Sequence, residues 1–144
     1  MKKKTTILIA ACAMLAVVAG VQVVRGQATT AAAGVYTEEQ AKKGLALYNE
    51  QCAACHGEDL AGNDIIPGLN GDTFATNWTG KSVGELYEKI NLTMPALNPG
   101  SLTGDQTAEI IALILSTNKY PAGKMALANT MEALNPVKID APRK

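Results

Sequence analysis

The 144-residue chain has little of several residue types that functional sites commonly use. It contains one histidine, three cysteines, one phenylalanine and one tryptophan. A single imidazole excludes an iron site with two histidine ligands from this chain, and a zinc site would need carboxylates to complete its usual four ligands. Aromatic residues make up only 4% of the sequence, which is a thin supply for the core of a small domain. A bound cofactor would supply the missing buried volume.

The chain also lacks net charge, because 13 basic residues balance 13 acidic ones. Four of the basic residues, Lys2, Lys3, Lys4 and Arg25, belong to the N-terminal segment 1–28. The remainder carries 9 basic and 13 acidic residues, hence a net charge of −4. A nucleic-acid partner requires a basic surface. We therefore expect no nucleic-acid binding.

The N-terminal segment 1–28 has the pattern of an export signal. Three lysines precede an apolar run from Ile7 to Val24, and a small-x-small cleavage site follows at 26–28. The run approaches the length that spans a bilayer, so an uncleaved anchor over residues 5–24 is an alternative to cleavage. Lipidation at Cys12 is a third. Each of the three predicts a periplasmic or otherwise extracytoplasmic location, either soluble or anchored.

The rest of the sequence predicts an all-α fold, because no alternating pattern is long enough to build a sheet. Three capping boxes mark helix starts at Thr37, Ser82 and Thr103, each with Glu or Gln three residues later. The predicted helices cover about 38–51, 83–91 and 104–118. Glycines and prolines interrupt the intervening segments, which indicates long loops.

These patterns divide the chain into four parts. A linker over 29–36 follows the leader, a single domain covers 37–120, and a C-terminal extension covers 121–144. The extension has scattered apolar residues, which indicate either packing against its own domain or docking to a partner. They are Met125, Leu127, Met131, Leu134, Val137 and Ile139.

The segment 52–56 reads Cys-Ala-Ala-Cys-His, and C-x-x-C-H is the attachment signature of a c-type haem. In such a motif Cys52 and Cys55 bind the porphyrin edge through thioethers, and His56 ligates the iron. The alternatives are a zinc site and a redox-active dithiol, but ligands for zinc are scarce and no strand precedes Cys52. We expect one covalent haem c.

The second axial ligand of the iron has several candidates, namely Met, Lys, Asn, water or an open site. Five methionines are present, of which Met1 and Met14 lie in the leader. Met94 alone precedes a proline, which stops the helix and favours an extended backbone. We therefore predict Met94 as the ligand and Met125 and Met131 as packing residues. The alternative for Met94 is ordinary core filling.

Taken together, these motifs resemble class I c-type cytochromes, in particular the small mono-haem domains that accompany bacterial quinoprotein alcohol dehydrogenases. The resemblance covers about residues 36–123. Its motifs are Gly44 and Tyr48 before the C-x-x-C-H segment, Asp59-Leu60-Ala61-Gly62, Pro67-Gly68-Leu69, Gly71-Asp72-Thr73-Phe74, Asn77-Trp78, Thr93-Met94-Pro95, Pro99-Gly100-Ser101-Leu102 and Pro121-Ala122-Gly123.

The resemblance implies a cytochrome c fold, with three to five helices wrapped around the haem. It implies that the Pro67 carbonyl accepts a hydrogen bond from His56, that Met94 ligates the iron and that Trp78 lies near the haem propionates. A turn residue and a core aromatic are the plain alternatives for Pro67 and Trp78. Leu113 stands where the family often has an aromatic residue, which is a departure from the usual aromatic contact between the first and last helices.

The expected function is electron transfer and not enzymatic catalysis. An iron held by His56 and Met94 has no free position for a substrate, and the thioether favours the ferrous state. The first hypothesis is a periplasmic one-electron carrier between a dehydrogenase and a terminal oxidase or another cytochrome. The alternatives are a fixed haem subunit of a larger membrane or dehydrogenase complex, and a five-coordinate haem sensor or peroxidase.

Overall fold

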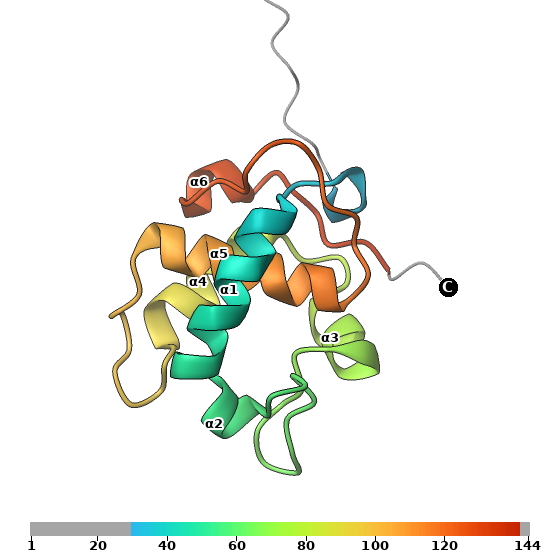
Figure 1. Cartoon of the computed structure of the whole chain (residues 1–144). Coiled ribbons are helices and arrows are strands. Elements are labelled where there is room, and N and C mark those ends of the chain that lie inside the picture. The colour runs from blue at the N-terminus through green and yellow to red at the C-terminus, as the bar shows by residue number, and fades with distance from the viewer. Residues whose placement is uncertain (1–29, 142–144) are drawn as a thin grey trace, which may run out of the picture.

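The computed structural model describes residues 30–141, and this part of the chain is helical with no strand (Figure 1). The elements are a 3-10 helix, η1 (Ala31–Ala33), and six α-helices: α1 (Glu38–Gln51), α2 (Ala53–His56), α3 (Gly71–Trp78), α4 (Val83–Thr93), α5 (Gly104–Thr117) and α6 (Met131–Leu134). Two isolated bridges join Lys138 to Thr30 and to Ser82. The predicted all-α class is confirmed.

The three predicted capping boxes are all present. The side chains of Thr37, Ser82 and Thr103 accept hydrogen bonds from the backbone three residues on, and the Gln or Glu at that position accepts one in return. Such pairs satisfy N–H groups that a helix start leaves without partners. The helices therefore begin where the sequence predicts, and their ends differ from prediction by at most two residues.

Within residues 30–141, three of the six α-helices are additional to those that the capping boxes mark, and the set is consistent with the expected cytochrome c fold. Two of the additional ones, α2 and α6, have four residues each, and α3 begins at Gly71 without a side-chain cap. A short helix without a strong cap depends on tertiary packing more than on its own sequence. Phe74, which is fully buried, supplies that packing for α3.

Helices α1 and α5 cross in close contact at Gly44. A Cβ atom built on Gly44 would lie 2.6 Å from the carbonyl carbon of Glu109 and 3.2 Å from Cβ of Leu113. Only a glycine permits this approach, which offsets its poor helix propensity. The contact between α1 and α5, the helix that the sequence predicts as the last, thus exists with Leu113 in place of an aromatic residue.

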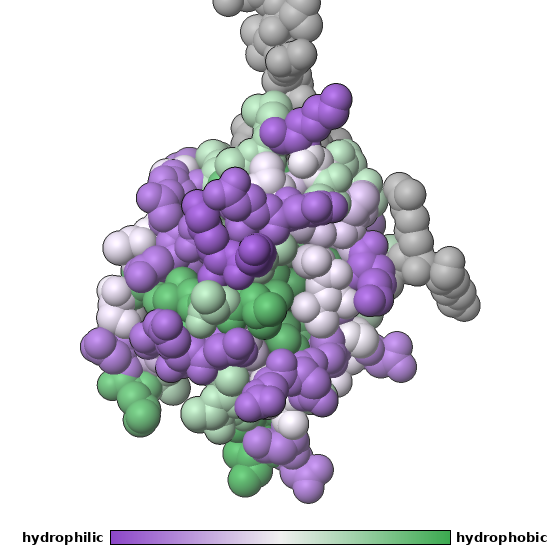
Figure 2. Space-filling view, in the orientation of Figure 1, coloured by the Kyte–Doolittle hydropathy of each residue, from purple (hydrophilic) through white to green (hydrophobic). Residues whose placement is uncertain are grey.

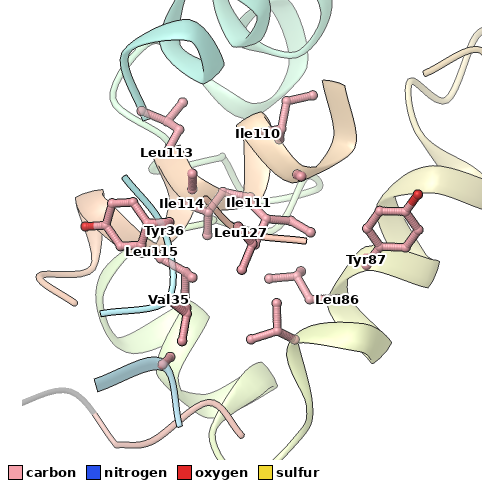
Figure 3. Packing of buried hydrophobic residues seen from close by; sticks show 14 of the residues in the cluster. Val35, Tyr36, Leu86, Tyr87, Ile110, Ile111, Leu113, Ile114, Leu115 and Leu127 are labelled. Carbon is pink, nitrogen blue, oxygen red and sulfur yellow. The ribbon is translucent and has the colours of Figure 1, made fainter. Parts of the chain in front are cut away.

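Segments from both ends of the described chain complete the core. In Figure 3 the side chains of α5 lie centrally, with Val35 and Tyr36 on one side and Leu86 and Tyr87 of α4 on the other. The expected linker is therefore not a free spacer. Ala31, Val35 and Tyr36 are buried, and the N–H of Ala31 donates to the Lys138 carbonyl at 2.7 Å.

The C-terminal extension packs against its own domain. Its buried residues are Leu127, Leu134, Val137 and Ile139, whereas Met131 is partly buried and Met125 is 65% exposed. This packing leaves few apolar side chains of the extension available to a partner.

All four tyrosines of the sequence donate a hydrogen bond from the side chain to a backbone carbonyl. Tyr36 bonds to Tyr120, Tyr48 to Gly57, Tyr87 to Asn129 and Tyr120 to Asp140. Each hydroxyl fixes a loop to a helix or to a neighbouring segment. Burial is the largest cause that raises the pKa of every one of these phenols.

The predicted leader and Cys12 lie outside the described residues. Within residues 30–141, no helix has the length and apolar character needed to span a membrane.

The crossing predicts the effect of Gly44→Ala. Alanine favours a helix, but its methyl group would overlap the Glu109 carbonyl, so we expect a loss of about 1–3 kcal/mol in the free energy of unfolding. Denaturant unfolding of the haem-loaded protein measures this. Lys42→Ala, on the exposed side of α1, is the control and should change stability by less than about 0.5 kcal/mol. An unchanged or raised stability of Gly44→Ala would contradict the close crossing.

Alkaline pH should destabilise the fold. Burial, with smaller effects from Cys52 and Asp59, raises the pKa of Tyr48 to about 12, whereas an unfolded tyrosine ionises near about 10. The full contribution of the neutral phenol is thus present below about pH 10 and is lost as the pH rises toward about 12. Denaturant unfolding measures the free energy of unfolding as a function of pH. Tyr48→Phe should reduce its loss between about pH 10 and pH 12 more than the control Tyr87→Phe does. An equal reduction in both variants would contradict the assignment to Tyr48.

Candidate haem site

The C-x-x-C-H segment begins where α1 ends. The N–H of Cys52 donates to the Tyr48 carbonyl at 2.8 Å and closes the last turn of α1. The N–H groups of Cys55 and His56 then donate to the Cys52 carbonyl at 3.1 and 3.0 Å. The two thiols and the imidazole are therefore carried on a single helical turn, whose position α1 determines.

Neither Cys52 nor Cys55 takes part in a disulfide. Cys52 is partly buried and Cys55 is exposed. Burial, and to a lesser degree the proximity of Cys55, raises the pKa of the Cys52 thiol to about 11. Redox-active cysteines have lowered pKa values instead. The environment of Cys52 thus disfavours the dithiol alternative.

His56 is oriented by the carbonyl of Pro67. The Nδ1 atom of His56 lies 3.0 Å from this oxygen. The resemblance implies this contact. A metal-bound imidazole usually donates its second ring N–H to a carbonyl or carboxylate, which fixes the ring and raises its basicity. With Nδ1 engaged, Nε2 is the nitrogen available for iron, and it has no hydrogen-bond partner within residues 30–141.

The loop over 57–70 is tightly packed against itself. The N–H of Gly62 donates to the His56 carbonyl at 2.8 Å. A Cβ atom on Gly62 would lie 2.6 Å from the nitrogen of Gly68, and one on Gly68 would lie 2.6 Å from the Ala61 oxygen. These approaches place the Pro67 carbonyl in a defined position relative to His56.

Met94 is the residue that follows α4. Its N–H donates to the Ile90 carbonyl at 2.9 Å, and its backbone is extended, with φ −124° and ψ 151°. This conformation is the one that a following proline favours. The side chain is partly buried and packs against the core cluster.

Trp78 ends α3 and is also partly buried against the core cluster. The ammonium group of Lys81 lies 4.9 Å from the centroid of its ring, a cation–π contact. This arrangement places the positive charge of Lys81 beside the tryptophan. That charge would stabilise a nearby anionic group such as a propionate.

The residues present fit a haem better than an isolated metal ion. The donors are two thiols, one imidazole and one thioether, which are the groups that attach and ligate a c-type haem. Several apolar side chains that pack against the core are only partly buried, and they include the candidate haem residues Cys52, Trp78 and Met94. Within residues 30–141, no three His, Cys, Asp or Glu side chains form a group suited to a metal ion.

Further apolar side chains are exposed in the segments that flank the candidate ligands. They are Leu45, Ile65, Leu92 and Leu97. Figure 2 shows apolar residues at the lower edge of the molecule, on the side where Figure 1 places α2. Exposed apolar surface of this kind commonly marks a cofactor or partner site.

Two side chains of the site have functions that the sequence motifs did not indicate. Tyr48 holds the Gly57 carbonyl, directly after His56, by a 2.7 Å hydrogen bond. Asn118, directly after α5, donates a hydrogen bond to the Leu69 carbonyl in the loop over 57–70. Tyr48 precedes Gly57 by nine residues and Asn118 follows Leu69 by 49, so only the folded structure shows these pairs.

The helical fold and the C-x-x-C-H turn define a class I c-type cytochrome, a haem-binding protein of electron transfer. Residues 39–114, just over half of the chain, match the family model "Cytochrome C oxidase, cbb3-type, subunit III", and the chain belongs to this family. Comparison with curated proteins and with solved structures gives no match. The finer likeness to domains that accompany quinoprotein alcohol dehydrogenases stays a prediction.

Proposed function

We propose that this protein is a mono-haem, one-electron carrier whose iron is ligated by His56 and Met94. The observation that carries the proposal is the orientation of His56, whose Nδ1 is held by Pro67 while Nε2 is left for the metal. Cys52 and Cys55, one turn apart from each other, would hold the haem through thioethers. Bound haem supplies the Fe(III)/Fe(II) couple.

The protein's part in the proposed function is to hold both ligands and to limit access to the iron. Met94 would supply the second ligand to the iron, and a thioether ligand would favour the ferrous state and raise the potential. An iron with both axial positions filled binds neither substrate nor dioxygen, which favours a carrier over a sensor or a peroxidase. Redox proteins are therefore the proposed donor and acceptor.

We also propose an extracytoplasmic location. The proposal rests on the basic and apolar pattern of residues 1–28 together with the covalent attachment motif. Retention or cleavage of this segment would determine whether the domain is tethered or free.

The family description favours a second candidate, a fixed haem subunit of a larger complex, because it names an oxidase subunit. The buried residues of the extension, Leu127, Leu134, Val137 and Ile139, pack onto their own domain, so they would not form part of the docking surface of such a subunit. The size of the native protein after gentle extraction separates a free carrier from a subunit.

Replacement of Met94 tests the ligation. Met94→Ala should open the axial position, so that the reduced protein binds carbon monoxide without ligand displacement. The midpoint potential should fall, within the range of about 0.8 V that axial ligands control. Redox titration and carbon monoxide difference spectra measure both effects.

Met125→Ala and Met131→Ala are the matched controls and should leave both measurements unchanged. Carbon monoxide binding to the parent protein as readily as to Met94→Ala would instead support the five-coordinate sensor or peroxidase.

A further inference from the structure

Asn118 is a buried polar residue directly after α5, with 6% of its surface exposed. Its Nδ2 donates to the carbonyl of Ile114, in the last turn of α5, at 2.8 Å and to that of Leu69, in the loop, at 2.9 Å. Its Oδ1, by contrast, is the one buried side-chain oxygen or nitrogen without a hydrogen-bond partner in the described part of the chain.

An unpaired buried oxygen is unfavourable, and a leucine of similar size would avoid it. The donor half of the Asn118 amide is therefore the part that the structure uses. That donor connects the end of α5 to a backbone carbonyl 49 residues away, in the loop that contains Pro67.

The loop over 57–70 connects the residue that Asn118 holds, Leu69, to the hydrogen-bond partner of His56, Pro67. Leu69 donates its own N–H to the Leu60 carbonyl at 2.7 Å, and Gly68 lies against Ala61 so closely that a Cβ atom would have no room. Pro67 lies two residues before the atom that Asn118 holds. A displacement of Leu69 would therefore move the Pro67 carbonyl away from Nδ1 of His56.

We propose that Asn118 is a positioning residue for the proximal ligand, which acts through Leu69 and Pro67 on the orientation and basicity of His56. The proposal rests on the ligation of iron by His56 proposed above. A hydrogen bond from Nδ1 makes the imidazole a stronger electron donor, which stabilises ferric iron. Loss of the Asn118 donor should weaken that bond and raise the midpoint potential.

Asn91, near the end of α4, offers a matched control. Its Nδ2 donates to the Leu102 carbonyl at 3.1 Å and to Oγ1 of Thr107 at 3.0 Å. It thus joins α4 and α5 to the loop that follows Met94. Asn91 is an amide with the same donor function, but it acts on the loop of the other candidate ligand.

The experiment compares the haem-loaded parent chain with Asn118→Leu and Asn91→Leu. Proton NMR of the oxidised protein measures the exchange of the His56 Nδ1 proton with solvent, and redox titration measures the potential. In Asn118→Leu we expect exchange to be faster by several-fold to about tenfold, as for the loss of one ordinary hydrogen bond, together with a higher potential. In Asn91→Leu we expect exchange at His56 to be unchanged and the thioether-to-iron charge-transfer band to weaken.

Unchanged exchange and potential in Asn118→Leu would overturn the proposal, and so would equal acceleration in both variants. Asn118→Ala removes the same donor with less bulk and takes the place of the leucine variant if that variant does not fold. A different measurement, the charge-transfer band of the parent protein, shows whether the proposed function itself fails. A parent protein without the charge-transfer band contradicts Met94 ligation, while exchange at His56 still tests Asn118.

Discussion

The crossing of α1 and α5 at Gly44 is the contact on which the rest of the molecule depends. Because Gly44 has no side chain, the backbone of α5 at Glu109 approaches α1 more closely than any Cβ atom would permit. The far end of α1 then sets the position of Cys52, and the far end of α5 sets that of Asn118. The absence of a side chain at Gly44 thus helps to position both the C-x-x-C-H turn after α1 and Asn118 after α5.

The loops that follow the candidate ligands are held by polar contacts, in contrast to the apolar core. The loop that follows His56 and the loop that follows Met94 are each attached through a backbone carbonyl to an asparagine in or directly after a helix: Asn118 holds Leu69, and Asn91 holds Leu102. Irregular loops bury little apolar surface. Directed hydrogen bonds of this kind therefore fix the conformation of these loops, as side-chain packing does in the core. The two candidate ligands, His56 and Met94, are thus followed by loops that have separate polar attachments.

The sequence predicted those features that depend on neighbouring residues. Capping boxes are local, so the starts of α1, α4 and α5 were found, and the C-x-x-C-H segment indicated its own chemistry. Helix α3 has no such cap, and its formation depends on the burial of Phe74. The packing of residues 31–36 onto the core and the partner of Asn118 arise from contacts between distant segments. No local pattern encodes these.

The central claim is that His56 and the thioether of Met94 together complete the coordination of a covalently held iron. Iron K-edge X-ray absorption of the oxidised native protein tests it directly, since the method distinguishes sulfur from nitrogen and oxygen neighbours of the metal. The account predicts one sulfur in the first coordination shell, with nitrogen in every other position. A shell of nitrogen and oxygen alone, or one with a vacant position, would contradict it.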